Sequence, residues 1–121
     1  MSEEPPILAV NHNAKNLHLL TIFLAQELYT THAVKSLDEF DHALAGQMTF
    51  CMALIDITGF AVRIWSRCRQ LYKKNIPFII ISPKQSAVIQ QTGLGHGARN
   101  VLIKPLVIRE LLAAIHSLLG G

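Results

Sequence analysis

The chain has 121 residues, of which 50% are apolar and only 16% are charged. Disordered chains combine low hydrophobicity with high charge, so this composition excludes disorder and predicts one folded domain. The longest apolar run, residues 50–55, is far shorter than the roughly 18 residues of a membrane span, and the acidic, proline-containing start is unlike a secretory signal. We therefore expect a cytoplasmic protein without a membrane partner, with a flexible segment over residues 1–6 and one domain over residues 7–121.

The charge pattern gives little support for a nucleic-acid partner. The net charge is +3, from 11 Lys and Arg against 8 Asp and Glu. Basic residues recur over residues 63–74, where they could contact phosphates, but a solvated helix face explains them more simply. Nucleic acid is therefore not the expected partner.

The two cysteines, Cys51 and Cys68, are too few for a disulfide framework. Neither has the spacing of a paired metal-ligand motif. We expect both to be reduced thiols.

Short apolar runs alternate with amphipathic stretches along the chain. The apolar runs predict strands over residues 7–10, 31–35, 51–55, 77–81 and 101–103. The stretches between and after them predict helices over residues 13–28, 36–46, 60–74, 86–92 and 106–119. Asn13 is placed to cap the first helix, and Ser36 with Glu39 forms a capping box at the second. The glycines at 93, 95 and 97 are expected to end the fourth helix and form a turn.

Five strands alternating with five helices predict an α/β protein whose parallel sheet is covered on both faces. The length suits a flavodoxin-like doubly wound sheet with strand order 2-1-3-4-5, whereas a barrel needs about twice as many residues. Ligands of such sheets gather at the carboxyl ends of the strands. The residues that can reach this edge are Asn11, His12, Asn13, Asp56, Ser82, Lys104 and Pro105. Asp56 ends a wholly apolar strand, so its carboxylate needs a partner, and Lys104 is the obvious candidate.

Five segments together resemble the receiver domain of two-component response regulators. Residues 7–13 resemble the opening strand, which in that family ends in an acidic pair, and residues 53–56 resemble the strand that presents the phosphoaccepting aspartate. Residues 78–82 match the strand that ends in a hydroxyl residue. Gly97-Ala98 and Lys104-Pro105 match the end of the family pattern. The resemblance spans nearly the whole chain.

The resemblance implies a phosphoryl switch. In this family a histidine kinase or a small phosphoryl donor phosphorylates the aspartate with help from a divalent cation. Carried over to this sequence, Asp56 is the phosphoacceptor, Ser82 hydrogen-bonds the phosphoryl oxygens, and Lys104 supplies compensating charge.

The acidic pair of the family is replaced by Asn11 and His12. Mg²⁺ is bound through carboxylates and waters, so the loss of two of three carboxylates predicts weak Mg²⁺ binding at best. We therefore expect no cofactor and no dedicated metal site. His12 is open to three interpretations: a metal ligand, a phosphoryl-stabilising cation, or a polar residue at a strand end. The last is favoured because the other five histidines fall on different elements.

Three further departures lie elsewhere in the pattern. The loop after Asp56, residues 57–60, is shorter than the family loop by about five residues. Val101 occupies the switch position, where the family has an aromatic ring that couples to the hydroxyl residue. Pro83 follows Ser82, where the family has a small residue that lets the phosphoryl group approach.

The sequence thus predicts an atypical, pseudo-receiver-like signalling domain that is not an enzyme and acts as a protein-interaction module with weak or absent phosphorylation. A conventional receiver switched at Asp56 is the alternative. A flavodoxin-like enzyme or small-ligand binder is a remote third, because no Gly-rich loop follows the first strand. The last helix is apolar around most of its surface, so we expect a protein partner or a second copy on the face formed by the fourth helix, fifth strand and fifth helix, besides a histidine kinase.

Overall fold

The computed structural model describes residues 5–120, which form an alternating series of strands and helices. The elements are β1 (Ile7–Val10), α1 (Ala14–Gln26), β2 (Thr31–Val34), α2 (Leu37–Ala45), β3 (Met52–Asp56), α3 (Ile64–Lys73), β4 (Phe78–Ser82), α4 (Ala87–Gly95), β5 (Asn100–Ile103) and α5 (Ile108–Leu119). The flexible segment expected over residues 1–6 lies mostly outside the described residues, which include only Pro5 and Pro6 of it.

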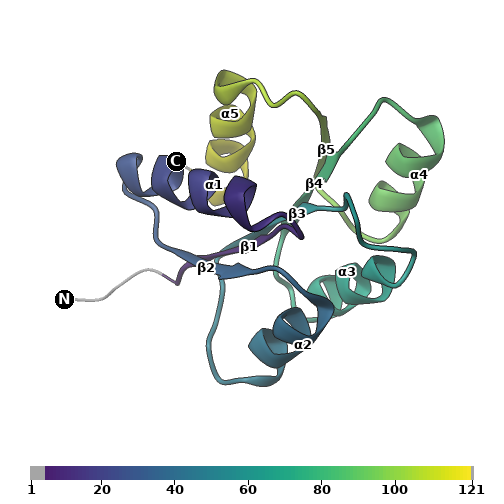
Figure 1. Cartoon of the computed structure of the whole chain (residues 1–121). Helices are drawn as coiled ribbons and strands as arrows, with labels where there is room; N and C mark the ends of the chain where they lie inside the picture. Colours follow the sequence, from purple (N-terminus) through teal and green to yellow (C-terminus); the bar gives the residue numbers. More distant parts are fainter. Residues whose placement is uncertain (1–4, 121) are drawn as a thin grey trace.

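The five strands form one parallel sheet in the order β2-β1-β3-β4-β5, which confirms the predicted topology. Helices α1 and α5 pack on one face of the sheet, and α2 and α3 pack on the other, with α4 beside β5 (Figure 1). Both faces are therefore covered. Because the strands are parallel, their carboxyl ends lie at the same edge of the sheet, where polar residues follow them.

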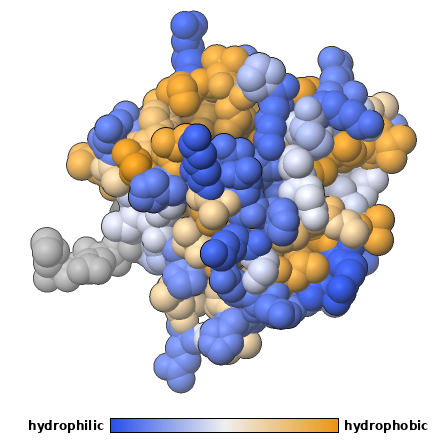
Figure 2. Space-filling view, in the orientation of Figure 1, coloured by the Kyte–Doolittle hydropathy of each residue, from blue (hydrophilic) through white to orange (hydrophobic). Residues whose placement is uncertain are grey.

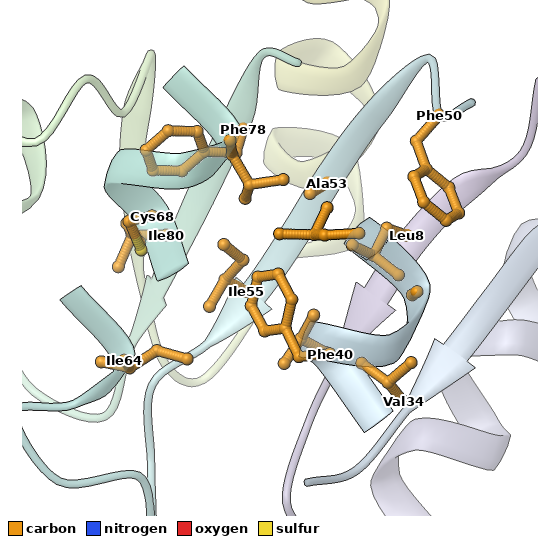
Figure 3. Packing of buried hydrophobic residues seen from close by; sticks show 14 of the residues in the cluster. Leu8, Val34, Phe40, Phe50, Ala53, Ile55, Ile64, Cys68, Phe78 and Ile80 are labelled. Atoms are coloured by element: carbon orange, nitrogen blue, oxygen red, sulfur yellow. The ribbon is translucent and has the colours of Figure 1, made fainter. Parts of the chain in front are cut away.

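The apolar strand residues fill two core layers, one on each face of the sheet. Every residue of β1, β3 and β4 is buried, as expected of strands covered on both sides. On the α2 and α3 face, Phe40, Phe78 and Ile80 pack with Cys68 and Ile64 (Figure 3). This core fixes the positions at which β1, β3 and β4 end.

Capping side chains set the start of α1, α2 and α4. Asn13 Oδ1 accepts the backbone N–H of Asn16 at 2.9 Å, as predicted. Ser36 Oγ accepts the N–H of Glu39 at 3.1 Å, whereas Glu39 Oε1 accepts the N–H of Lys35 at 2.8 Å. The predicted capping box is therefore half formed, because the glutamate bonds the residue before the cap.

The prediction that the fourth helix ends at residue 92 is wrong, because α4 continues to Gly95. Gly93 lies inside the helix against the sheet, where a Cβ would come within 3.3 Å of Val101 and 3.4 Å of Ile80. This glycine permits close packing rather than a turn. The chain turns at Gly97, which has a φ of +103°.

Two other helices begin later than predicted. Helix α3 begins at Ile64 rather than near residue 60, and α5 begins at Ile108 rather than at residue 106. Neither start has a side-chain cap, so the preceding residues form turns instead. The predicted bounds of the strands differ from the observed ones by one residue at most at each end.

Cys51 and Cys68 do not form a disulfide, as expected. Burial raises the pKa of the Cys68 thiol to about 12, so this side chain behaves as a small apolar group. In residues 5–120, no helix combines the length and apolar character that a membrane span requires.

Candidate functional site

Asp56 is the last residue of β3 and its side chain is buried at the carboxyl edge of the sheet. Each carboxylate oxygen accepts hydrogen bonds from fixed neighbours. Oδ1 accepts the backbone N–H of Thr58 at 3.0 Å, and Oδ2 accepts the side-chain amide of Asn11 at 3.3 Å. An unpaired carboxylate in such a position costs several kcal/mol, and these donors together with a cation offset that cost.

Lys104 supplies the cation, as the sequence predicted. Its Nζ lies 2.6 Å from Asp56 Oδ2 and donates a second hydrogen bond to Thr58 Oγ1 at 3.0 Å. Strand β5 ends at the residue before Lys104 and the Lys104 N–H bonds the Ser82 carbonyl at 2.9 Å, so the backbone on which the lysine stands is itself fixed. The side chain of Lys104 is 30% exposed and that of Asp56 is 5% exposed, so the pair is closed on one side and wet on the other.

Asn11 connects the first strand to this pair. Its amide nitrogen donates to Asp56, while its Oδ1 accepts the N–H of Asn13 at 2.9 Å, so the amide orientation is fixed from both ends. Asn11 is buried, and it therefore belongs to the network rather than to the solvent-exposed loop.

Sequence reasoning did not assign Thr58 a role, although it holds two members of the network. Its backbone N–H bonds Asp56 and its hydroxyl accepts from Lys104. An aspartate that accepts the N–H two residues ahead is typical of a turn after a strand, and that local rule would have found the first contact.

His12 lies beside the site but makes a different contact. It is exposed, and its ring meets the ring of Phe60 edge-on at 5.7 Å, with the backbone of Gly59 close to the imidazole. Gly59 has a φ of +82°, and a Cβ there would lie 3.0 Å from the imidazole. This placement fits the favoured interpretation of His12 as a polar residue at a strand end.

Ser82 ends β4 at the same edge and is buried, but its hydroxyl is engaged locally. Ser82 Oγ donates to the carbonyl of Lys84 at 2.6 Å and accepts the Lys84 N–H at 3.4 Å. The hydroxyl is thus held in the turn around Pro83.

Val101 lies on β5 and is partly buried against the core layer of α2 and α3. A Cβ at Gly93 would come within 3.3 Å of its side chain, so α4 packs directly over it. A short aliphatic side chain in this place has no ring that could swing between a buried and an exposed position.

The donor set around Asp56 does not suit Mg²⁺. Among residues 5–120, no three His, Cys, Asp or Glu side chains converge on a possible metal position. Asp56 is the single carboxylate of the network, its charge is balanced by Lys104, and Asn11 offers it a donor rather than an acceptor. Mg²⁺ prefers carboxylate and water oxygens in an octahedron, and the buried residues here supply one carboxylate that is already paired.

The fold of this chain is similar to the folds of solved receiver-domain structures. The chain superposes on a CheY-like receiver domain protein from Methanospirillum hungatei with a TM-score of 0.86 and 22% identity, covering 98% of this chain and 95% of that chain. It matches a two-component response regulator from Clostridium difficile with a TM-score of 0.86 and 18% identity, covering 97% of both chains. No protein-family model matches the sequence.

Curated relatives are similar over part of the sequence. The response regulator ArlR of Staphylococcus saprophyticus is 33% identical over 72 residues, which is 59% of this chain and 33% of that protein. The ArlR of Staphylococcus epidermidis is 42% identical over 53 residues, which is 43% of this chain and 24% of that protein. The chain thus spans about a third of the length of the first of these relatives. The chain therefore has the fold of response-regulator receiver domains, and part of its sequence is similar to response regulators.

The structure brings Asn11, Asp56 and Lys104 into one hydrogen-bonded cluster at the carboxyl edge of the sheet. Ser82 is at the edge but bonded to its own turn, and His12 is turned toward Phe60.

Proposed function

We propose that this receiver domain, over residues 7–121, works as a protein-interaction module in two-component signalling, with weak or absent Mg²⁺-dependent phosphorylation of Asp56. The observation that carries the proposal is the network of Asp56: its oxygens are bonded by Asn11, Thr58 and Lys104, and within residues 5–120 no second carboxylate joins them. The domain then has no catalytic activity of its own and works in the cytoplasm.

Electrostatics supports slow phosphorylation. Phosphoryl transfer to a carboxylate brings two anions together, and a metal ion normally neutralises the charge that gathers on the phosphoryl oxygens. Here Lys104 is the cation at hand, and it already neutralises Asp56. Loss of a metal is worth several kcal/mol in the transition state, and each 1.4 kcal/mol is about tenfold in rate, so we expect phosphorylation at least about a thousandfold slower than with a metal.

A conventional phosphoreceiver is the second candidate. It is favoured by the direct pair of Asp56 with Lys104 and by the hydroxyl of Ser82 at the same edge, since these are the three residues that the family pattern assigns to the phosphoryl group. In that case Asp56 is the acceptor, and Ser82 and Lys104 contact the phosphoryl oxygens after the Ser82 hydroxyl leaves Lys84.

The proposed interaction surface is the face of α4, β5 and α5, facing a protein partner, a second copy or a histidine kinase. Large apolar side chains are exposed along it, and Figure 2 shows apolar surface where α5 and α4 lie. They are Val88, Leu94, Ile103, Val107 and Ile108. Exposed apolar side chains that gather on one face of a soluble domain support a binding site there.

A calorimetric Mg²⁺ titration tests the proposal for the site. We expect no saturable heat for the unmodified chain at millimolar Mg²⁺, and saturable binding once Asn11→Asp and His12→Asp restore two carboxylates. Saturation of the unmodified chain at low millimolar Mg²⁺ contradicts the proposal and favours the conventional receiver.

Sedimentation velocity over a wide concentration range tests the surface. If a second copy is the partner, association rises with concentration and Ile108→Glu abolishes it, because the change places a charge in the apolar face. A strict monomer at high concentration removes self-association and leaves a different protein as the partner.

A further inference from the structure

A hollow lies away from the Asp56 network, beside the outer edge of the sheet. It has a volume of about 840 Å³ and is lined by β2, α2 and the loop that joins α2 to β3. Residues 32–34 form the strand side, and Asp38, Glu39, His42 and Met48 lie opposite or beside them. Figure 1 shows β2 at the end of the sheet, with α2 next to it.

The backbone of β2 is open along this hollow. Within residues 5–120, β2 pairs with β1 alone, in a register in which Ile7 donates to the Thr30 carbonyl and Asn11 donates to the Val34 carbonyl. Alternate residues of a parallel strand turn their N–H and C=O to the same side, so His32 and Val34 face β1. The N–H and C=O groups of Thr31 and Ala33 therefore face away from the sheet. Such an edge is a template for one more strand.

The other edge of the sheet is partly closed. On β5 the N–H of Val101 is bonded at 2.8 Å by the side chain of Asn100. At β2 the equivalent local bond occurs only at the end of the strand, where Lys35 donates to Glu39. An added strand thus finds consecutive open backbone groups at β2 and a blocked one at β5.

The hollow has a charge opposite to that of the whole chain. Its lining contains the carboxylates of Asp38 and Glu39 and no Lys or Arg, although the net charge of the chain is +3. Glu39 uses Oε1 for the Lys35 N–H, which leaves its other oxygen and Asp38 for a ligand. Val34, Ala43 and Met48 supply an apolar part of the lining. The complementary ligand is cationic with some apolar surface.

We propose that the β2 edge binds an extended cationic peptide segment of a partner protein, which joins the sheet as a sixth strand. The peptide backbone bonds the N–H and C=O groups of Thr31 and Ala33. Side chains two residues apart on the peptide face α2, so a Lys or Arg reaches Asp38 and Glu39 while an apolar neighbour on that face contacts Met48. This surface is separate from the face of α4, β5 and α5, and the inference does not depend on phosphorylation.

The test uses a capped Lys-Val hexapeptide of sequence Lys-Lys-Val-Val-Lys-Lys as the probe, because this order places both Lys and Val on each face of a strand, and the full chain is labelled for NMR. We expect saturable shifts of the Thr31 and Ala33 amides, slower hydrogen exchange at both, and weaker binding as salt is raised. A Glu-Val hexapeptide of the same length is the charge control. A Lys-Val hexapeptide with alternate backbone nitrogens methylated keeps the charge but cannot form the ladder, and we expect at least tenfold weaker binding.

Two variants complete the test. Asp38→Asn with Glu39→Gln removes the charge and keeps the shape, and we expect severalfold weaker binding of the Lys-Val peptide. Asp41→Asn, on the same helix but paired with Arg67 outside the hollow, is the matched control and leaves binding unchanged.

Three outcomes overturn the proposal. The first is the absence of saturable shifts at Thr31 and Ala33 at millimolar Lys-Val peptide. The second is equal binding of the methylated peptide, which reduces the contact to charge alone. The third is slow exchange of the Thr31 and Ala33 amides that appears without peptide and grows with protein concentration, which assigns the edge to a second copy of this chain.

Discussion

The two ends of the candidate site differ in how their polar groups are used. At the β1, β3 and β5 end, Asn11, Asp56 and Lys104 bond one another across 45 or more residues of sequence. At the β4 end, Ser82 bonds Lys84, two residues away. Long-range contacts hold the first of these, the tertiary end of the site. A turn holds the second, the local end.

The paired polar groups of the site lie around Asp56 and not around Ser82. Asp56 and Lys104 neutralise each other without any other ion, and the lysine side chain is the more exposed of the two. Ser82 sits at the same edge yet takes no part in the pair. If the domain works as a conventional receiver, the phosphoryl group has to displace contacts at the first end and bond the hydroxyl at the second.

Removal of Lys104 breaks the tertiary end most strongly. Lys104→Met strands the Asp56 carboxylate, which is 96% buried, and we expect a loss of about 3 kcal/mol in the free energy of unfolding. Chemical denaturation measures it. Lys84→Met, in an exposed loop, is the matched control and is expected to change stability by less than about 0.5 kcal/mol. An unchanged unfolding free energy for Lys104→Met means that Asp56 is solvated.

Asn11→Asp converts the donor beside Asp56 into a second carboxylate. The new carboxylate can still accept the Asn13 N–H, but it repels Asp56, to which the amide donated a hydrogen bond. In the presence of a chelator, we expect the free energy of unfolding to fall by about 2 kcal/mol. Millimolar Mg²⁺ is expected to restore part of that loss. Gln90→Glu, an exposed change of amide to carboxylate on α4, is the control and is expected to show no Mg²⁺ dependence. Equal stability of Asn11→Asp with and without Mg²⁺ contradicts this account.

Cys68 gives the free energy of unfolding a pH dependence that comes from the core and not from the Asp56 site. The native thiol keeps its proton up to its pKa of about 12, whereas the unfolded thiol loses it near pH 8.5 to 9, so rising pH favours the unfolded chain. Between pH 7 and pH 10, the wild type is expected to lose roughly 1–2 kcal/mol more stability than Cys68→Ala loses. Parallel denaturation curves at the two pH values measure this. Equal losses in both proteins place the pH dependence elsewhere.

Ser82→Ala tests the local end and has the smallest expected effect. Loss of the hydrogen bond to the Lys84 carbonyl is expected to cost about 1 kcal/mol. The unfolding free energy of Lys104→Met measured on the Ser82→Ala background gives the coupling between the two ends. We expect additivity within about 0.5 kcal/mol, whereas a large coupling energy shows that Ser82 belongs to the Asp56 network.

Much of the fold follows from local patterns in the sequence. The apolar strands and the Asn13 cap are determined by residues close to one another, and the order of elements limits the sheet to few topologies. Gly93 was misread as a helix end because its role depends on Ile80 and Val101, which come from two strands. A glycine chosen for close packing has the same local signature as one chosen for a turn.

The candidate site shows the same division. Asp56 and Lys104 could be paired from the sequence because a buried charge at a strand end requires a partner at the same edge. The hydroxyl direction of Ser82 and the turn of His12 toward Phe60 could not, since both depend on loop conformations after the strands. The resemblance to receivers implied the roles of Asp56, Ser82 and Lys104. The structure shows that Ser82 and Lys104 already bond other groups, which a phosphoryl group would have to displace.

The most direct test of the central claim is phosphorylation of the intact chain. The protein is incubated with acetyl phosphate and Mg²⁺, and intact mass is followed with time for the unmodified chain, for Asp56→Asn, and for Asn11→Asp combined with His12→Asp. The account predicts no measurable gain of a phosphoryl group by the unmodified chain on the time scale in which the double variant is labelled. Ready labelling of the unmodified chain that disappears in Asp56→Asn contradicts it.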